Sequence, residues 1–218
     1  MAFNPSKESI KLASLNKLHD DAHAVLDSVK AAKTAFDNAT NDRETSFAPL
    51  KKLSTKIVNA LAATDASKLT LDDASSINFK IQGRRNGKKV VAVAGKDDTP
   101  PEPAGISVSQ QSFDTLVDNF AKLTQTVAAE AHYTPNENEL RVTTPNSLLA
   151  DLRARNKAVV AAITSLSNAR IARDTLLHAA NTGLYDTAQS VKQYIKSLFD
   201  ATSPQYRQVS GIKFTSRA

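Results

Sequence analysis

The stretch LHDDAHAVLDSVKAAKTAFDNA, residues 18–39, decides the fold of this 218-residue chain. Its apolar or small residues recur in alternating steps of four and three: Leu18, Ala22, Val25, Val29, Ala32, Phe36 and Ala39. A repeat of about 3.5 residues keeps one face of a helix turned toward a partner helix over several turns. We therefore expect a long helix whose apolar seam packs against another helix.

A matching stretch, LLADLRARNKAVVAAITSLSNA, follows 130 residues later at residues 148–169. The same register gives Leu148, Leu152, Arg155, Val159, Ala162, Leu166 and Ala169, with only the third position polar. Phe3-Asn4-Pro5 likewise aligns with Tyr133-Thr134-Pro135. Self-similarity at a fixed offset indicates an internally repeated architecture, in which one copy alone cannot bury its apolar seam. We therefore expect an all-α, internally duplicated bundle of two fused helical hairpins, each begun by one of these long helices.

The chain is expected to form a single helical domain over residues 1–218. We place repeat 1 at about 3–83, an insert loop at 84–111, a connecting helix at 112–131 and repeat 2 at about 133–214. Proline and glycine in the insert forbid continued helix, so we expect an irregular surface loop or a short β-hairpin there. Residues 77–81 fit a helix ended by Gly83 better than a strand that turns at Asn86-Gly87.

Capping residues should mark the helix ends. The candidates are Ser14 and Thr144 as N-caps, Pro145 at the first helical position, Thr70 with Asp73 as a capping box, and Ser203-Pro204 before a short helix that Gly211 ends. Side-chain oxygens at such positions accept hydrogen bonds from free amide groups, and proline lacks the amide that a first turn leaves unpaired.

The composition excludes several classes of enzyme. The chain has no cysteine, which removes disulfides, thiol nucleophiles and thiolate metal sites. With six glycines it lacks the GxxxxGK[ST] and GxGxxG phosphate-binding loops, and no serine lies in a GxSxG elbow. We therefore predict a protein without enzymatic activity or cofactor.

The sequence predicts no transmembrane segment, because nothing in it approaches the roughly 20 apolar residues that cross a bilayer as a helix. The N-terminus carries no apolar stretch like that of a signal peptide. The expected location is the cytoplasm, and export by a signal-less route stays open.

His19 and His23 are the residues that most resemble a metal site. Two imidazoles four residues apart share one helix face, as in the zinc sites of HExxH type. However, Asp20 is shorter than the glutamate of that motif, no third ligand can be placed by spacing, and the second copy has Leu149 and Arg153 instead. We interpret the pair as partly solvated side chains beside the seam and predict no metal.

Arg43 and Arg173 occupy matching positions where the seam calls for an apolar residue. A buried guanidinium requires a partner, so we expect a carboxylate such as Asp42, Glu44 or Asp174, or carbonyl groups at a helix end. The alternative is an anion site on a pseudo-twofold axis between the two copies.

Charge supplies an alternative function. The net charge is +6 at pH 7, and Arg84, Arg85, Lys88 and Lys89 place four positive groups within six residues. Such a patch can attract nucleic acid or an anionic surface. A solvated basic loop is the simpler interpretation, because aromatic residues that stack on bases are sparse. A third hypothesis, membrane activity, rests on the apolar run at residues 90–94, which is too short to cross a bilayer.

The connecting helix has an apolar stripe without a counterpart in the repeat, formed by Phe113, Val117, Phe120 and Leu123. A helix face that its own core does not cover is a protein-binding surface, although burial against the two hairpins is the alternative. Together with the alanine-rich seams, the stripe predicts a non-enzymatic helical scaffold. Such a scaffold would act on a partner protein or by self-assembly into a homo-oligomer.

Three segments resemble recurring blocks of an uncharacterised family of bacterial proteins: VSQQSFD at 108–114, YTPNE at 133–137 and ATSPQYRQVSGIKF at 201–214. The resemblance covers most of the chain, with the proline-rich insert the least alike. It implies an all-helical bacterial protein, and it carries no activity, cofactor or site residue.

Overall fold

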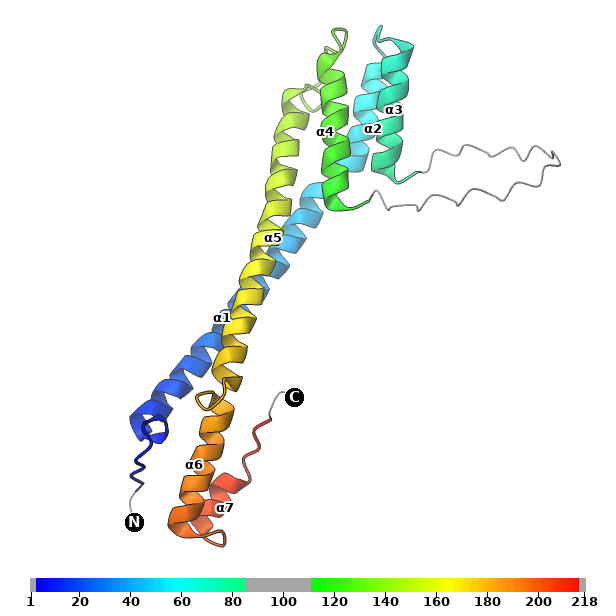
Figure 1. Ribbon diagram of the computed structural model, residues 1–218. Coiled ribbons are helices and arrows are strands. Elements are labelled where there is room, and N and C mark those ends of the chain that lie inside the picture. Colours follow the sequence, from blue (N-terminus) through cyan, green and yellow to red (C-terminus); the bar gives the residue numbers. More distant parts are fainter. Residues whose placement is uncertain (1–2, 85–110, 216–218) are drawn as a thin grey trace, which may run out of the picture. The chain divides into compact units, whose positions relative to one another are not determined.

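The computed structural model describes residues 3–84 and 111–215, and all regular structure in these ranges is helical (Figure 1). A 3-10 helix, η1 (Glu8–Ile10), is followed by α1 (Leu12–Phe47), α2 (Leu50–Ala62), α3 (Lys68–Gln82), α4 (Phe113–Ala129), α5 (Thr143–His178), α6 (Leu184–Phe199) and α7 (Pro204–Ser210). The expected all-α class is therefore confirmed. The β-hairpin considered for the insert has no strand to support it in these ranges, and residues 85–110 lie outside them.

The chain divides into two compact units. Unit 1 consists of Met1–Ala39 and Val160–Ala218, and unit 2 is Thr40–Val159. Unit 1 holds α6 and α7, unit 2 holds α2, α3 and α4, and both α1 and α5 contribute residues to each unit. No helix in the two described ranges is long and apolar enough to cross a membrane.

Unit 2 contains a core in which α2, α3 and α4 pack against one another. Ile57 and Leu61 of α2, Ile81 of α3, and Phe120 and Leu123 of α4 are completely buried. Apolar residues recur at helical spacing on α2 and α4, so each of these helices turns one stripe inward. Burial of apolar area contributes roughly 25 cal/mol per Å², which makes this core the main source of stability in unit 2.

Three serines begin helices by capping. The hydroxyl groups of Ser67, Ser112 and Ser203 accept hydrogen bonds from backbone N–H groups three residues later, at the starts of α3, α4 and α7. The sequence predicted this role for Ser203, together with the end of α7 at Gly211. Gly83 ends α3 in the left-handed region at φ 75°, which confirms the helix over residues 77–82 in place of a strand.

Other expected caps are wrong. Thr70 does not open a capping box with Asp73, because α3 begins before it and Ser67 already accepts from the Thr70 amide. α1 and α5 also begin before the expected positions, so Ser14 and Thr144 lie inside first turns and Pro145 is the third residue of α5 rather than its first. The hydroxyl of Thr144 donates to the carbonyl oxygen of Asn138 instead.

The long helices do not fold back into the expected hairpins. Ala48 and Pro49 separate α1 from α2, and Pro49 keeps right-handed helical angles (φ −77°, ψ −13°). α2 therefore runs on from the end of α1 and packs against α3 and α4 (Figure 1). α6 runs on from the end of α5 in the same way, after residues 179–183. Proline permits this continuation because its ring fixes φ at a value that suits a helix start.

Burial confirms the expected register of the seams. Every seam residue of α1 from Leu18 to Ala39, and of α5 from Leu148 to Ala169, is buried or half-buried. The extent of coverage varies along the seam: Leu152 is inaccessible, whereas Val25 and Val29 are half-buried. The shielded face of each helix was therefore predictable from periodicity, and its degree of coverage was not.

Candidate functional site

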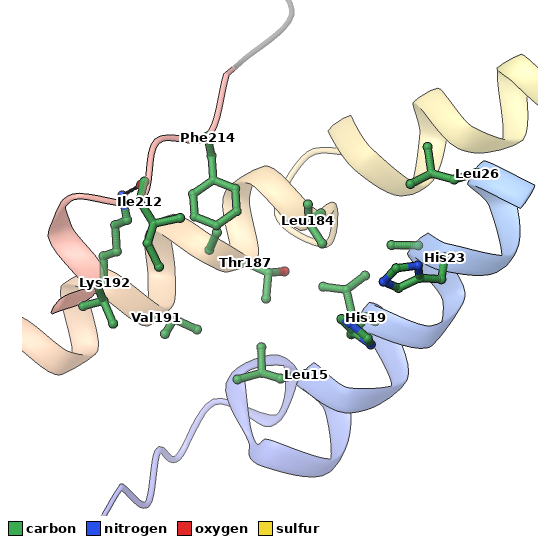
Figure 2. Close-up of a pocket in the computed structure, with 14 residues that line it drawn as sticks. Leu15, His19, His23, Leu26, Leu184, Thr187, Val191, Lys192, Ile212 and Phe214 are labelled. Atoms are coloured by element: carbon green, nitrogen blue, oxygen red, sulfur yellow. Dashed lines mark hydrogen bonds between the residues drawn. The ribbon is translucent and has the colours of Figure 1, made fainter.

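A pocket of about 310 Å³ lies in unit 1 between the N-terminal half of α1, α6 and the segment that follows α7 (Figure 2). Its lining comes from α1 (Leu15, Leu18, His19, Ala22, His23, Leu26), α6 (Leu184, Thr187, Ala188, Val191, Lys192), α7 (Val209) and the C-terminal segment (Ile212, Phe214). On α1 and α6 these residues recur in steps of three and four, which places them on one face of each helix. Two apolar helix faces thus form opposite walls of the pocket.

The pocket walls are mainly aliphatic side chains that unit 1 covers only in part. Leu26 is 41 % exposed and Ile212 is 52 % exposed. Thr187 is buried, and its hydroxyl donates to the carbonyl oxygen of Thr182 at 3.4 Å. Because this polar atom already has an acceptor, the pocket interior offers apolar contact rather than free hydrogen-bonding groups.

Lys192 places a positive charge at one end of the pocket (Figure 2). Its Nζ donates to the carbonyl oxygen of Ser210 at 3.4 Å and to that of Ile212, and it lies 5.3 Å from the ring centroid of Phe214. These three partners are uncharged. Among the residues that the structure describes, none brings a carboxylate within ion-pair distance of this ammonium group.

His19 and His23 lie on the α1 side of the pocket, and both are exposed. Their ring centroids are 4.5 Å apart, and Nδ1 of His19 is 3.1 Å from Oδ1 of Asp20. In residues 3–84 and 111–215, no third histidine, cysteine, aspartate or glutamate joins them in a group that could hold a metal ion. Zinc sites use three or four protein ligands, so the pair is better described as two basic side chains at the pocket edge.

The pocket therefore combines an apolar volume with basic groups at its edges. Its ionisable lining residues are Lys192, His19 and His23, and none is acidic. The volume falls at the lower end of the roughly 300–1,000 Å³ that is typical of small-molecule sites. The sequence analysis did not predict this site. The signal for it was the pair of apolar residues Ile212 and Phe214 beyond the last helix, which do not belong to any helical repeat and must pack elsewhere.

The apolar stripe of α4 is not a free surface. Phe120 and Leu123 are inaccessible and Val117 is buried, and all three belong to the core of unit 2. Phe113 is half-buried and packs edge-on against Phe47, with ring centroids 4.8 Å apart. The interaction face predicted on this helix is therefore wrong, because α2 and α3 cover it.

Arg173 has the kind of partner that the sequence predicted. Its Nε and Nη2 donate to one carboxylate oxygen of Asp174, at 2.9 and 2.6 Å. Arg43 departs from the expectation, since its Cζ lies 4.0 Å from the ring centroid of Phe113 and its Nε is buried without an acceptor. Arg43 belongs to unit 2 and Arg173 to unit 1. Each guanidinium thus packs within its own unit, which favours a structural role over a shared anion site.

Asp42, an expected partner of Arg43, pairs with a different arginine. Nη1 of Arg155 lies 3.0 Å from Oδ2 of Asp42, and Nε of Arg155 lies 3.2 Å from Oδ1 of Asp151. Arg155 is the polar residue in the second seam, so the position that interrupts the apolar pattern carries an ion pair between α1 and α5.

The structure describes only part of the basic loop. Arg84 is exposed, and its backbone N–H donates to the carbonyl oxygen of Phe79 at 2.9 Å at the end of α3. Arg85, Lys88 and Lys89 lie outside the described residues. Contact between this loop and nucleic acid stays a prediction.

An exposed apolar face does occur on α5. Val160, Ile163 and Ile171 are 63, 47 and 63 % exposed. Steps of three and eight residues keep these side chains on one side of the helix, away from the seam. We name these three residues the outer α5 stripe.

The pocket of unit 1 and the outer α5 stripe are thus two surfaces of the described residues that leave apolar side chains open to a ligand or partner. Comparison of the chain with protein-family models, with curated proteins and with solved structures finds no match, so its function has to be inferred from its own residues.

Proposed function

We propose that the chain is a non-enzymatic helical scaffold that binds another protein through the outer α5 stripe. The exposure of Val160, Ile163 and Ile171 is the observation that carries this proposal. Soluble proteins routinely expose single apolar residues, but here three lie on one helix face, separated only by the short side chains of Thr164 and Ser167, and a partner helix would cover them together. The stripe extends over about 16 Å of helix, a length that one amphipathic partner helix can follow.

Charge favours an acidic partner over a second copy of this chain. Residues 152–173 contain no aspartate or glutamate. Lys157 precedes the stripe on the same helix, Arg170 lies beside Ile171, and both cations are exposed. Two copies of this face would oppose like charges, whereas an amphipathic helix flanked by glutamates would oppose unlike ones.

The internal duplication belongs to the same proposal. α1 and α5 each contain 36 residues, and each is followed by a shorter helix that continues beyond its end. Helices of this length extend about 54 Å, which suits a protein that presents long faces to partners. Duplication of one long-helix segment would supply two such faces from a single ancestral sequence.

Fluorescence anisotropy with a labelled synthetic peptide tests the proposal. The peptide is an amphipathic helix with leucines on one face and glutamates on both flanks, and its matched control carries lysine at each glutamate position. We expect the glutamate peptide to bind at least tenfold more tightly than the lysine peptide, because the stripe is flanked by cations. The V160S/I163S/I171S variant should lose most of this affinity.

The A161S/A172S variant is the control for the protein, because it changes exposed residues of α5 outside the stripe. It should bind the glutamate peptide as the wild type does. Equal binding of both peptides, or unchanged binding by the V160S/I163S/I171S variant, would contradict the proposal. A mass that doubles with concentration, and does so only when the stripe is intact, would replace the acidic partner with a second copy.

Binding of nucleic acid or an anionic surface is the second candidate function. The net charge of +6 and the exposure of Arg84 favour it. Such binding would weaken steeply as salt is added, because counterions are released from the phosphates. Serine at Arg84, Arg85, Lys88 and Lys89 together would flatten that dependence and leave the outer α5 stripe intact.

A further inference from the structure

We propose that the pocket of unit 1 binds a free medium-chain carboxylate, that is, an unbranched acyl chain with an anionic head. This inference is independent of the protein-binding proposal, because no residue of the outer α5 stripe lines the pocket. It rests on the shape of the pocket, on its aliphatic walls and on the charge at its edges.

An acyl chain suits the walls of the pocket. Leu15 and Leu26 of α1 face Leu184 and Val191 of α6 across a narrow space, as Figure 2 shows. These side chains are half-buried or exposed, so part of their apolar surface remains in contact with water. A flexible, unbranched chain between the two helix faces would cover them without displacing any hydrogen-bonded group.

Lys192 suits the anionic head. An ammonium group has three N–H donors, and the carbonyl oxygens of Ser210 and Ile212 accept two of them. One donor therefore remains for a carboxylate at the end of the pocket, where Lys192 lies beside Ile212 and Phe214 (Figure 2). A charge-assisted hydrogen bond of this kind is stronger than one to a neutral oxygen.

The charge of the lining selects an anion over other amphiphiles. Lys192, His19 and His23 are the ionisable lining residues, and no acidic side chain lines the pocket to repel a carboxylate. Among the ionisable lining residues, a cationic head would meet the ammonium group of Lys192 and the two imidazoles, and none of these offers it a negative charge. A neutral head would gain the apolar contacts and no ion pair. We therefore expect affinity to fall from carboxylate to alcohol to quaternary ammonium.

Isothermal titration calorimetry on the full chain tests this order. The probes are decanoate, decanol and decyltrimethylammonium, which share one chain length, each used below its solubility or micelle limit. Decanoate should bind at least tenfold more tightly than either of the others. Nuclear magnetic resonance should show the largest amide shifts at residues 187–192 and after α7.

Lys192→Met retains the aliphatic stem and removes the charge, so it should reduce decanoate affinity to that of decanol. Lys196→Met is the matched control, because Lys196 is the next lysine of α6 and does not line the pocket. Ala188→Leu fills part of the pocket and should weaken all three probes. Far-ultraviolet circular dichroism verifies that each variant keeps its helical content.

Several results would overturn the proposal. They are the absence of decanoate binding, equal affinity for the anionic and cationic probes, decanoate affinity unchanged in Lys192→Met, and amide shifts confined to unit 2. Binding to phosphatidylglycerol vesicles without binding to free decanoate would also overturn it, since the acyl chain would then belong to a membrane lipid.

Discussion

Tyr133 ties the loop after α4 to the segment before α5 through one buried hydroxyl group. Its Oη donates to the carbonyl oxygen of Leu140 at 2.9 Å, and the residue is 5 % exposed. Burial, together with the nearby carboxylate of Glu137, raises the pKa of Tyr133 to about 12. The folded chain therefore stabilises the neutral phenol.

Ionisation of Tyr133 should destabilise unit 2. A tyrosine in an unfolded chain titrates near pH 10, so the stabilisation is complete below about pH 10 and is lost as the pH rises through about 12. Tyr133→Phe should lower the free energy of unfolding by about 1–2 kcal/mol at pH 8, because the Leu140 carbonyl loses its donor. The gap between variant and wild type should shrink toward pH 12.

Urea unfolding at pH 8 and pH 11 measures this gap. Tyr185→Phe serves as the control, because Tyr185 lies on α6 in unit 1. A gap of the same size at both pH values would show that the proton on Tyr133 does not contribute to stability.

The two arginines at apolar positions of the repeat pattern show how far the sequence predicts the partners of single residues. Arg173 pairs with Asp174, its neighbour in the chain, and proximity alone suggests this partner. Arg43 instead packs on Phe113, which is remote in sequence and reaches it only because α4 joins the core of unit 2. Periodicity identifies both arginines as polar residues at apolar positions. The partner of Arg43, however, depends on the tertiary fold.

Among the elements, α4 is a core helix, and truncation of its central aromatic residue should reveal this. Phe120 is inaccessible, so Phe120→Ala should lower the free energy of unfolding by about 3–5 kcal/mol. Lys122 is exposed on the same helix, and Lys122→Ala should change the free energy of unfolding by no more than about 0.5 kcal/mol. Chemical denaturation, monitored by circular dichroism, measures the free energy of unfolding of each variant. Unchanged stability of Phe120→Ala, with loss of an oligomer, would restore α4 as an interaction face.

Helices and their shielded faces could be predicted from the sequence, whereas their neighbours could not. The 3.5-residue period marks the inward side of α1 and α5, and glycine at position 83 marks the end of α3. The predicted hairpins require a turn after each long helix, yet the helical angles of Pro49 let α2 continue from α1. A proline just before a helix is compatible with either a chain reversal or a continued direction, so contact of α2 with α3 and α4 decides between the two.

The pocket was predictable only on its α1 side. Leu18 and Ala22 belong to the predicted seam, and His19 drew attention for a metal-like spacing. Ile212 and Phe214 complete the lining from the opposite end of the sequence, beyond the last helix. No local pattern indicates that two such distant segments meet, because that contact depends on packing within unit 1.

Over the whole molecule, burial is unequal between the two units. Within the described residues, the large cluster of buried apolar side chains runs from Phe47 to Leu152 and lies entirely in unit 2. Among the described residues of unit 1, the buried apolar side chains are Pro5, Ile10, Ala22 and Leu166. Because buried apolar area is the principal stabilising contribution, unit 1 should be the less stable of the two.

Hydrogen exchange of the intact chain, followed by mass spectrometry, should show this difference directly. We expect the amides of α2 and α4 to exchange most slowly and those of α6 and α7 to exchange earlier, because local opening of unit 1 exposes less apolar area. Decanoate should slow exchange in α6 and leave α4 unchanged, since a ligand stabilises the folded unit that binds it by mass action. Equal exchange rates in both units would mean that the chain unfolds as one cooperative body. Protection confined to α4 would instead place the ligand in unit 2 and contradict the pocket of unit 1 as its site.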